Sequence, residues 1–327
     1  MAINCNGVFE GGGVRGIGHV GAACGLEQAG YRFVHLAGSS AGAIVASLLA
    51  CGYTAPQLRL LLEGLDYLRF RQEGLLSRMG TMGKAVSLYT QLGVYDADYF
   101  EQWLSELLGK KGFTTFGRLR TRPGDPERWK LQITASDVTN HRLLILPQDF
   151  ALFGLDPDQC RIARAVRMSM SIPLFYKPCH LRGADGRDHL IVDGGLLSNY
   201  PVWLFDNPQL PVGLPTLGFK FVDDKPSGYC DRQGGCKISF WDYLKLLTAT
   251  ALDGADKQHI SEGGGDFART VAISATVEEQ GERHKISATD FGLTPEQSRQ
   301  LFQNGLTAAE HFLTTWSFFD WQRQYRA

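Results

Sequence analysis

The 327-residue sequence lacks an excess of charge of either sign. Its 33 basic and 34 acidic side chains give a formal net charge of −1. A protein that binds nucleic acid through its overall field has a clear basic excess, so we expect no nucleic-acid partner. Any attraction to a membrane surface must come from a local patch.

Long hydrophobic runs and a disulfide framework are also missing. The longest apolar run, at about residues 41–51, is far shorter than the ~20 residues that span a bilayer. Residues 1–10 lack the basic and then apolar pattern of a signal peptide. The seven cysteines are odd in number and scattered, and Cys230 and Cys236 have no second cysteine or histidine pair near them. We therefore expect free thiols, no metal site, and a cytoplasmic protein that is at most peripheral to a membrane.

The sequence does contain short apolar runs that alternate with helical patterns. This alternation predicts an α/β fold with a mostly parallel sheet. Strands are predicted at residues 8–10, 33–37, 131–135, 143–146, 189–192, 216–222 and 270–274. Helices are predicted at about residues 17–30, 41–51, 100–108, 160–168 and 240–260, with a last one after an N-cap at Thr294. We interpret residues 1–327 as a single domain, in which the poorly periodic segment 66–95 is a cap.

The first motif is Gly38-Ser39-Ser40-Ala41-Gly42, a G-x-S-x-G sequence between a predicted strand and a predicted apolar helix. Small neighbours allow the strained turn that exposes a serine hydroxyl as a nucleophile. The N-terminus of the following helix favours negative charge on a bound oxygen. We interpret Ser40 as a nucleophile, the alternative being that it only caps the helix.

A glycine loop, Gly11-Gly12-Gly13-Val14-Arg15-Gly16, follows the first predicted strand. Its backbone N–H groups could closely approach a phosphate or an oxyanion. A dinucleotide fingerprint would need an acidic residue about 20 positions further on, but Leu36 and Ala37 occupy that place. We therefore favour an oxyanion hole. The predicted oxyanion group consists of Gly11, Gly12, Gly13, Arg15, Gly16 and Ala41.

The third motif, Asp193-Gly194-Gly195, follows the strand predicted at residues 189–192. An aspartate at the end of a buried strand suits a general base, although Asp-Gly also occurs in ordinary turns. In parallel sheets, ligands bind at the carboxyl edge, where successive strands end together. We therefore expect the three motifs to converge at that edge.

Taken in order, the three motifs resemble those of the patatin-like phospholipases. Further similar segments are Ser169-Met170-Ser171-Ile172-Pro173, Asn199-Tyr200-Pro201 and Thr289-Asp290-Phe291, so the resemblance extends over about residues 7–313. It implies a three-layer α/β/α fold and a lipid acyl hydrolase of the phospholipase A or lysophospholipase type.

The resemblance also implies roles for individual residues. Ser40 corresponds to the nucleophile and Asp193 to the base of a catalytic dyad without histidine. Gly38, Gly42, Gly194 and Gly195 support the two motifs. The implied substrate is a lipid or another ester, and the implied chemistry needs no cofactor.

Two other functions stay open. His259, His284 and His311 follow Asp193 in the chain order used by α/β hydrolases, so one of them could complete the Ser-Asp-His triad of a carboxylesterase. Alternatively, the glycine loop could bind a nucleotide or a phosphate in a non-catalytic protein.

Apolar and basic residues are interleaved within the predicted cap. The apolar residues are Leu75, Leu76, Met79, Met82, Val86 and Leu88, and the basic ones are Arg69, Arg71, Arg78 and Lys84. Such a stripe could contact anionic lipid headgroups transiently, or it could pack on the core with its basic ends in water. The sequence leaves both open, and it leaves homo-oligomerisation open too.

Overall fold

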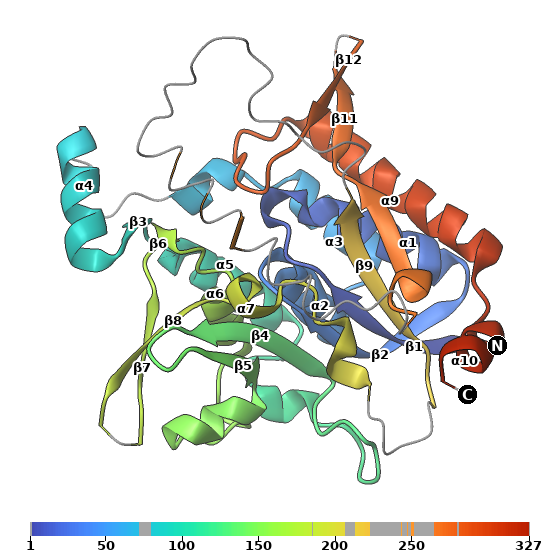
Figure 1. The fold of residues 1–327 in the computed structure, drawn as a ribbon, viewed down its shortest axis with the longest axis horizontal. Coiled ribbons are helices and arrows are strands. Elements are labelled where there is room, and N and C mark those ends of the chain that lie inside the picture. Colours follow the sequence, from blue (N-terminus) through green and yellow to red (C-terminus); the bar gives the residue numbers. More distant parts are fainter. Residues whose placement is uncertain are drawn as a thin grey trace.

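A mixed eight-stranded sheet forms the centre of the molecule (Figure 1). The computed structural model describes residues 2–71, 80–184, 186–206, 213–222, 243, 247, 250–251, 265–279 and 281–326. In spatial order the strands are β10 (Thr270–Ser274), β9 (Thr216–Val222), β1 (Ile3–Phe9), β2 (Tyr31–Gly38), β4 (Leu131–Asp137), β8 (Asp188–Asp193) and β7 (Cys179–Arg182), and β5 (Arg142–Leu146) pairs with β4. The five strands from β10 to β4 run parallel.

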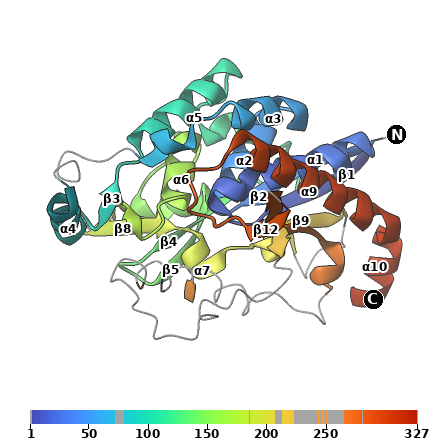
Figure 2. The same ribbon diagram turned by 90° about the horizontal axis from the view of Figure 1, so that it is seen from above.

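Helices lie on both faces of this sheet. The described helices are α1 (Gly16–Gln28), α2 (Ala41–Ala50), α3 (Ala55–Glu63), α4 (Gly80–Gln91), α5 (Asp98–Lys110), α6 (Ile162–Ser169), α7 (Gly195–Ser198), α9 (Pro295–Thr315) and α10 (Phe318–Tyr325). Short 3₁₀ helices are η1 (Gly13–Arg15), η2 (Tyr67–Arg71), η4 (Phe116–Leu119), η5 (Gln148–Phe153), η6 (Val202–Phe205) and η7 (Phe267–Arg269). Most of the longer helices gather on one face, and α7 lies on the other (Figure 2).

Two small sheets lie outside the central one. β3 (Gly93–Tyr95) pairs in parallel with β6 (Leu174–Tyr176), and β11 (Thr276–Glu279) forms an antiparallel pair with β12 (Glu282–Lys285). The segment predicted as a cap therefore contains η2, α4 and β3, while Leu75, Leu76, Arg78 and Met79 lie outside the described residues.

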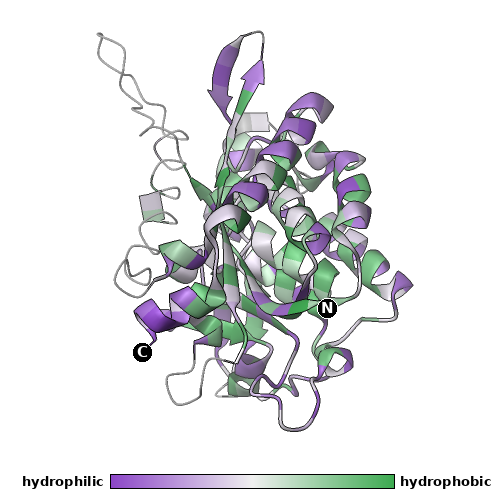
Figure 3. Ribbon diagram, turned by 90° about the vertical axis from the view of Figure 1, so that its right-hand side faces the viewer, coloured by the Kyte–Doolittle hydropathy of each residue, from purple (hydrophilic) through white to green (hydrophobic). Residues whose placement is uncertain are grey.

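The central strands bury side chains on both faces, as parallel strands between helices do. Phe9 and Leu36 point into the main core, which they share with the larger helices. Their neighbours Val8 and Ala37 pack on the opposite face against a smaller cluster that includes Tyr200 and Val202. Hydrophobic residues, green in Figure 3, accordingly concentrate between the layers.

The predicted α/β fold with a mostly parallel sheet is confirmed. Each predicted strand and each predicted helix within the described residues is present, with ends shifted by a few residues. Thr294 caps α9 by accepting a hydrogen bond from the Gln297 backbone N–H. The predicted helix at residues 240–260 lies mostly outside the described residues, as do Cys230 and Cys236.

The direction of β8 differs from that of the parallel strands. β8 runs antiparallel to β4, and it stops with Asp193 opposite Ala135. On the other side of β4, Gly38 at the end of β2 lies opposite Ile133. The register therefore brings Asp193 close to the level of the turn after β2, although β8 enters the sheet from the opposite direction.

Candidate active site

Ser40 occupies a strained turn between β2 and α2. Its backbone has φ 51° and ψ −122°, a region that non-glycine residues rarely adopt and that often marks a functional site. The turn is tight enough that a Cβ atom at Gly38 would overlap Gly42, and one at Gly42 would overlap the carbonyl oxygen of Phe9. The two glycines of the motif are therefore required by close backbone approach.

A direct hydrogen bond joins Ser40 to Asp193. Ser40 Oγ donates to Asp193 Oδ2 at 2.7 Å. The other carboxylate oxygen, Oδ1, accepts a hydrogen bond from the Gly195 backbone N–H at 2.8 Å. Both side chains are buried, and Asp193 is only 1% exposed. The carboxylate is thus held in one orientation, with one oxygen directed at the serine hydroxyl.

Burial changes the acidity of this carboxyl group. Removal from water raises the pKa of Asp193 to about 7, and the hydrogen bonds from Ser40 and Gly195 offset only part of this effect. A carboxylate with a pKa near 7 accepts a proton more readily than an ordinary one with a pKa near 4. The group can therefore act as a base in neutral solution.

The glycine loop lies against the serine turn. A Cβ atom at Gly11 would lie 3.2 Å from the Cβ of Ser40, and one at Gly16 would lie 3.5 Å from the Cβ of Ala41. The loop is anchored by the Gly11 backbone N–H, which donates to the Asn199 carbonyl at 3.0 Å. Arg15 stabilises the loop through a hydrogen bond inside it, because its Nε donates to the Gly12 carbonyl oxygen at 3.1 Å.

The loop also leaves some backbone donors unused. The N–H groups of Gly11, Val14, Arg15 and Gly16 donate to carbonyl oxygens of the protein. Within the described part of the chain, the N–H groups of Gly12 and Gly13 donate to no protein acceptor, and neither does that of Ala41 at the start of α2. These three donors flank the serine turn and are available to a ligand.

Sequence reasoning missed what the segment at the C-terminal end of α6 does. Ser169 Oγ accepts a hydrogen bond from the Ser40 backbone N–H at 2.9 Å, and the Ser171 carbonyl accepts one from the Asp193 backbone N–H at 2.9 Å. The segment therefore ties the two halves of the site together. Its only sequence signal was the resemblance of residues 169–173 to a family motif, which assigned no role.

Comparison with known proteins agrees with this arrangement. The family model described as "Patatin-like phospholipase" matches residues 7–206, a range that includes the glycine loop, the serine turn and Asp193. The chain belongs to the patatin-like phospholipase family. Membership in this family supports lipid acyl hydrolysis in general terms.

Two curated proteins and a solved structure are similar to this chain over almost its full length. The uncharacterized protein YqhO of Bacillus subtilis (strain 168) is 35% identical over 313 residues, which cover 96% of this chain and 99% of YqhO. The uncharacterized protein R571 of Acanthamoeba polyphaga mimivirus is 24% identical, with 92% of this chain and 91% of R571 covered. The crystal structure of VipD from Legionella pneumophila matches with 18% identity and a TM-score of 0.49, over 95% of this chain and 67% of that chain.

The histidines considered for a triad do not reach this patatin-like site within the described residues. His284 lies on the β11–β12 hairpin with a half-exposed side chain, and His311 is exposed on α9. No described histidine is hydrogen-bonded to Ser40 or Asp193. His259 lies outside the described residues. The helices that the structure describes also include none with both the length and the apolar character needed to cross a bilayer.

Proposed function

We propose that the protein is a serine lipid acyl hydrolase of the phospholipase A or lysophospholipase type. Ser40 is the nucleophile and Asp193 the general base of a dyad that cleaves fatty-acyl esters through a covalent acyl-enzyme. The single observation that carries this proposal is the 2.7 Å hydrogen bond from Ser40 Oγ to the buried Asp193 carboxylate, formed at a strained turn. Family membership supports the lipid class of substrate.

In the first half-reaction Ser40 Oγ attacks the carbonyl carbon of the ester. Asp193 Oδ2 accepts the hydroxyl proton while the new C–O bond forms, and the carbonyl oxygen becomes an oxyanion. The tetrahedral intermediate then collapses, the ester C–O bond breaks, and the departing alcohol takes the proton from Asp193. The products are a free alcohol, such as a lysolipid, and an acyl group bound to Ser40.

Water completes the cycle. It attacks the acyl carbonyl while Asp193 accepts one of its protons, and collapse of the second intermediate releases the fatty acid and returns the proton to Ser40 Oγ. We narrow the proposed oxyanion donors to the N–H groups of Gly12, Gly13 and Ala41, because those of Gly11, Arg15 and Gly16 are already used within the protein. The N-terminus of α2 adds positive potential at the same place.

The oxyanion assignment predicts a loss of activity for one glycine-to-alanine change and almost none for another. Gly13 has φ 56° and its Cβ would overlap the Ala288 carbonyl oxygen, so Gly13→Ala must displace the loop. We expect kcat to fall ~10²-fold to 10³-fold, the usual cost of losing one oxyanion donor. Gly16→Ala is the matched control, because its Cβ would meet only ordinary contacts and it should stay within a few-fold of wild type. Equal activity of the two variants would contradict the assignment.

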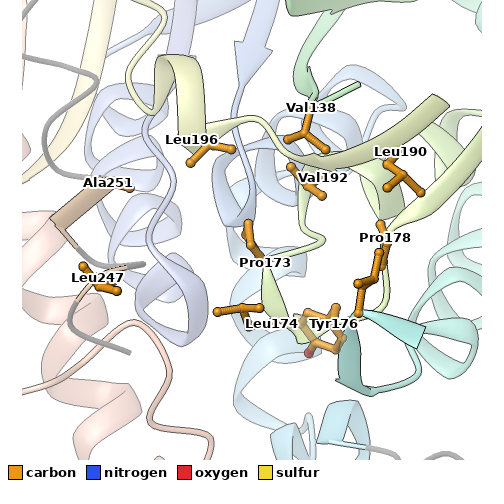
Figure 4. Close-up of a pocket in the computed structure, with 11 residues that line it drawn as sticks. Val138, Pro173, Leu174, Tyr176, Pro178, Leu190, Val192, Leu196, Leu247 and Ala251 are labelled. Atoms are coloured by element: carbon orange, nitrogen blue, oxygen red, sulfur yellow. The ribbon is translucent and has the colours of Figure 1, made fainter. Parts of the chain in front are cut away.

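An apolar cavity of about 320 Å³ is lined in part by residues that neighbour the Asp193 motif in the chain (Figure 4). Its lining includes Val138, Pro173, Leu174, Leu190, Val192 and Leu196. Val192 directly precedes Asp193, and Leu196 directly follows the two glycines of that motif. The volume falls at the lower end of the ~300–1,000 Å³ range of ligand sites. We propose that the cavity receives the acyl chain of the substrate.

Hydrolysis of a series of soluble esters with increasing acyl length tests the proposed function. We expect kcat/KM to rise up to about fourfold per methylene, since burial of a CH₂ group is worth ~0.8 kcal/mol, until the cavity is full.

Leu196→Asn should reduce the preference for long over short chains about tenfold, through ~1.5 kcal/mol of lost apolar burial. Leu197→Asn is the control, because Leu197 is also half-buried on α7 but does not line the cavity. Absence of hydrolysis across the series, or no dependence on chain length, would contradict the proposal.

A further inference from the structure

Helix α4 exposes its large apolar side chains and buries small or polar residues. It lies at the edge of the molecule, away from the main helical layer (Figures 1 and 2). Its most exposed apolar side chains are Met82, which is 80% exposed, and Tyr89, which is 86% exposed, and Val86 between them is 43% exposed. Among the α4 residues whose burial is described, the buried ones are instead Gly83 and Ser87. A surface helix normally does the opposite and turns its apolar stripe inward.

The buried side fixes this orientation. Ser87 is fully buried, and its Oγ donates to the Gly93 carbonyl oxygen at 2.8 Å. Gly93 belongs to β3, which pairs with β6. Rotation of α4 to bury its apolar face would break this hydrogen bond and bring large side chains to where Gly83 and Ser87 now pack. The apolar face is therefore held outward.

The exposed residues form one continuous stripe. Positions 82, 86 and 89 follow the i, i+4, i+7 spacing of a single helix face. Leu92, immediately after the helix, is also partly exposed, at 45%. Leu92 also lines the apolar cavity proposed for the acyl chain. Leu92 therefore connects the end of α4 to the lining of that cavity.

We propose that this face of α4, made of Met82, Val86 and Tyr89, docks the protein on a lipid surface. The choice of a lipid partner rests on the proposed function, because a lipid acyl chain drawn from a bilayer would pass along this stripe into the cavity. The composition of the helix fits: GTMGKAVSLYTQ contains one lysine and no acidic residue, so anionic headgroups are not repelled. Tyr89 adds the amphipathic ring that is common at membrane interfaces.

The test is co-sedimentation of the full chain with vesicles of phosphatidylcholine and phosphatidylglycerol. All proteins carry Ser40→Ala, so that the vesicles stay intact and binding does not depend on hydrolysis. We expect Met82→Glu with Tyr89→Glu to weaken vesicle binding at least about tenfold, because two charges would have to enter the interface. Both positions are exposed, so thermal unfolding should not shift.

Leu60→Glu on α3 is the matched control. Leu60 is 73% exposed and apolar, but it belongs to a helix that packs with α1 and α9. Vesicle binding that survives Leu60→Glu and is lost in the double variant supports the proposal. Equal binding by both variants would overturn the proposal, and so would a parent protein that does not bind vesicles. It would also be overturned if the parent protein were a dimer that the double variant dissociates, with no vesicle binding by either protein. A catalytically inactive wild type that still binds vesicles through α4 would reject the proposed function alone.

Discussion

Ser40→Ala is expected to lower kcat/KM for fatty-acid release from phospholipid by ~10⁴-fold or more, the loss typical of removing a nucleophile that works with its base as a unit. Without Oγ no acyl-enzyme can form, and Asp193 loses the hydroxyl from which it takes a proton. The measurement is fatty-acid release from phosphatidylcholine, combined with labelling by a fluorophosphonate probe. Labelling of the wild type should map to Ser40 and disappear in the variant.

Ser39→Ala provides a closely matched control. Ser39 is fully buried next to the nucleophile, and its Oγ has no hydrogen-bond partner among the described residues. Its removal leaves no other group unpaired, so activity should stay within a few-fold of wild type and probe labelling should persist. If Ser40→Ala kept more than about a hundredth of wild-type activity, the nucleophile would have to be another residue.

The serine turn could be predicted from the sequence because its requirements are local. A strand, a positive-φ residue and a helix within a few positions need small neighbours, and Gly38 and Gly42 supply them. The same reasoning located the glycine loop and Asp193. That Ser40 and Asp193 would meet was inferred from the general geometry of parallel sheets, and they do meet.

The route by which Asp193 reaches Ser40 could not be predicted in this way. A short apolar strand reads the same in either direction, so residues 189–192 carried no sign that β8 runs antiparallel to β4. Direction and register depend on the chain between β5 and β8, which includes the segment at Ser169 and Ser171. The hydrogen bonds of that segment to Ser40 and Asp193 are contacts between distant residues, and no local pattern encodes them.

The surface of α4 was only partly foreseen, for a different reason. The sequence placed Met82 and Val86 among the apolar residues of the cap, but it predicted no helix there and could not show whether those side chains face inward or outward. The decisive residues are the buried Gly83 and Ser87, and the hydrogen bond of Ser87 to β3 is a tertiary contact. Likewise, the acyl-chain cavity combines Leu92 with Val192 and Leu196, which are far apart in the chain.

Asp193→Asn should lower kcat ~10³-fold to 10⁴-fold, because an amide keeps the shape of the side chain but cannot take the proton from Ser40.

The wild type should show a pH dependence of activity that follows the ionisation of Asp193. With the Asp193 pKa raised to about 7 by burial, the fraction in the ionised, active form falls about tenfold per pH unit below that value. A pH–rate profile of kcat/KM on a non-ionising ester should therefore rise with slope one and level off above pH ~7. A profile that levels off near pH 4 would indicate a base with an ordinary carboxyl pKa and would contradict the raised pKa of Asp193.

The same substitution should stabilise the fold while it removes activity. Asp193 has a folded pKa of about 7 against an ordinary value of 3.8, so the folded state binds the proton more tightly than the unfolded state. Its contribution to stability is therefore full below pH ~4 and is lost as the pH rises to ~7, at a cost of about 4 kcal/mol above that range. Asparagine carries no charge to bury, so urea unfolding should find Asp193→Asn more stable than wild type, by about 2–3 kcal/mol more at pH 8 than at pH 5. An equal difference at both pH values would show that burial does not raise the pKa of this carboxyl, and the argument for its strength as a base would fail with it.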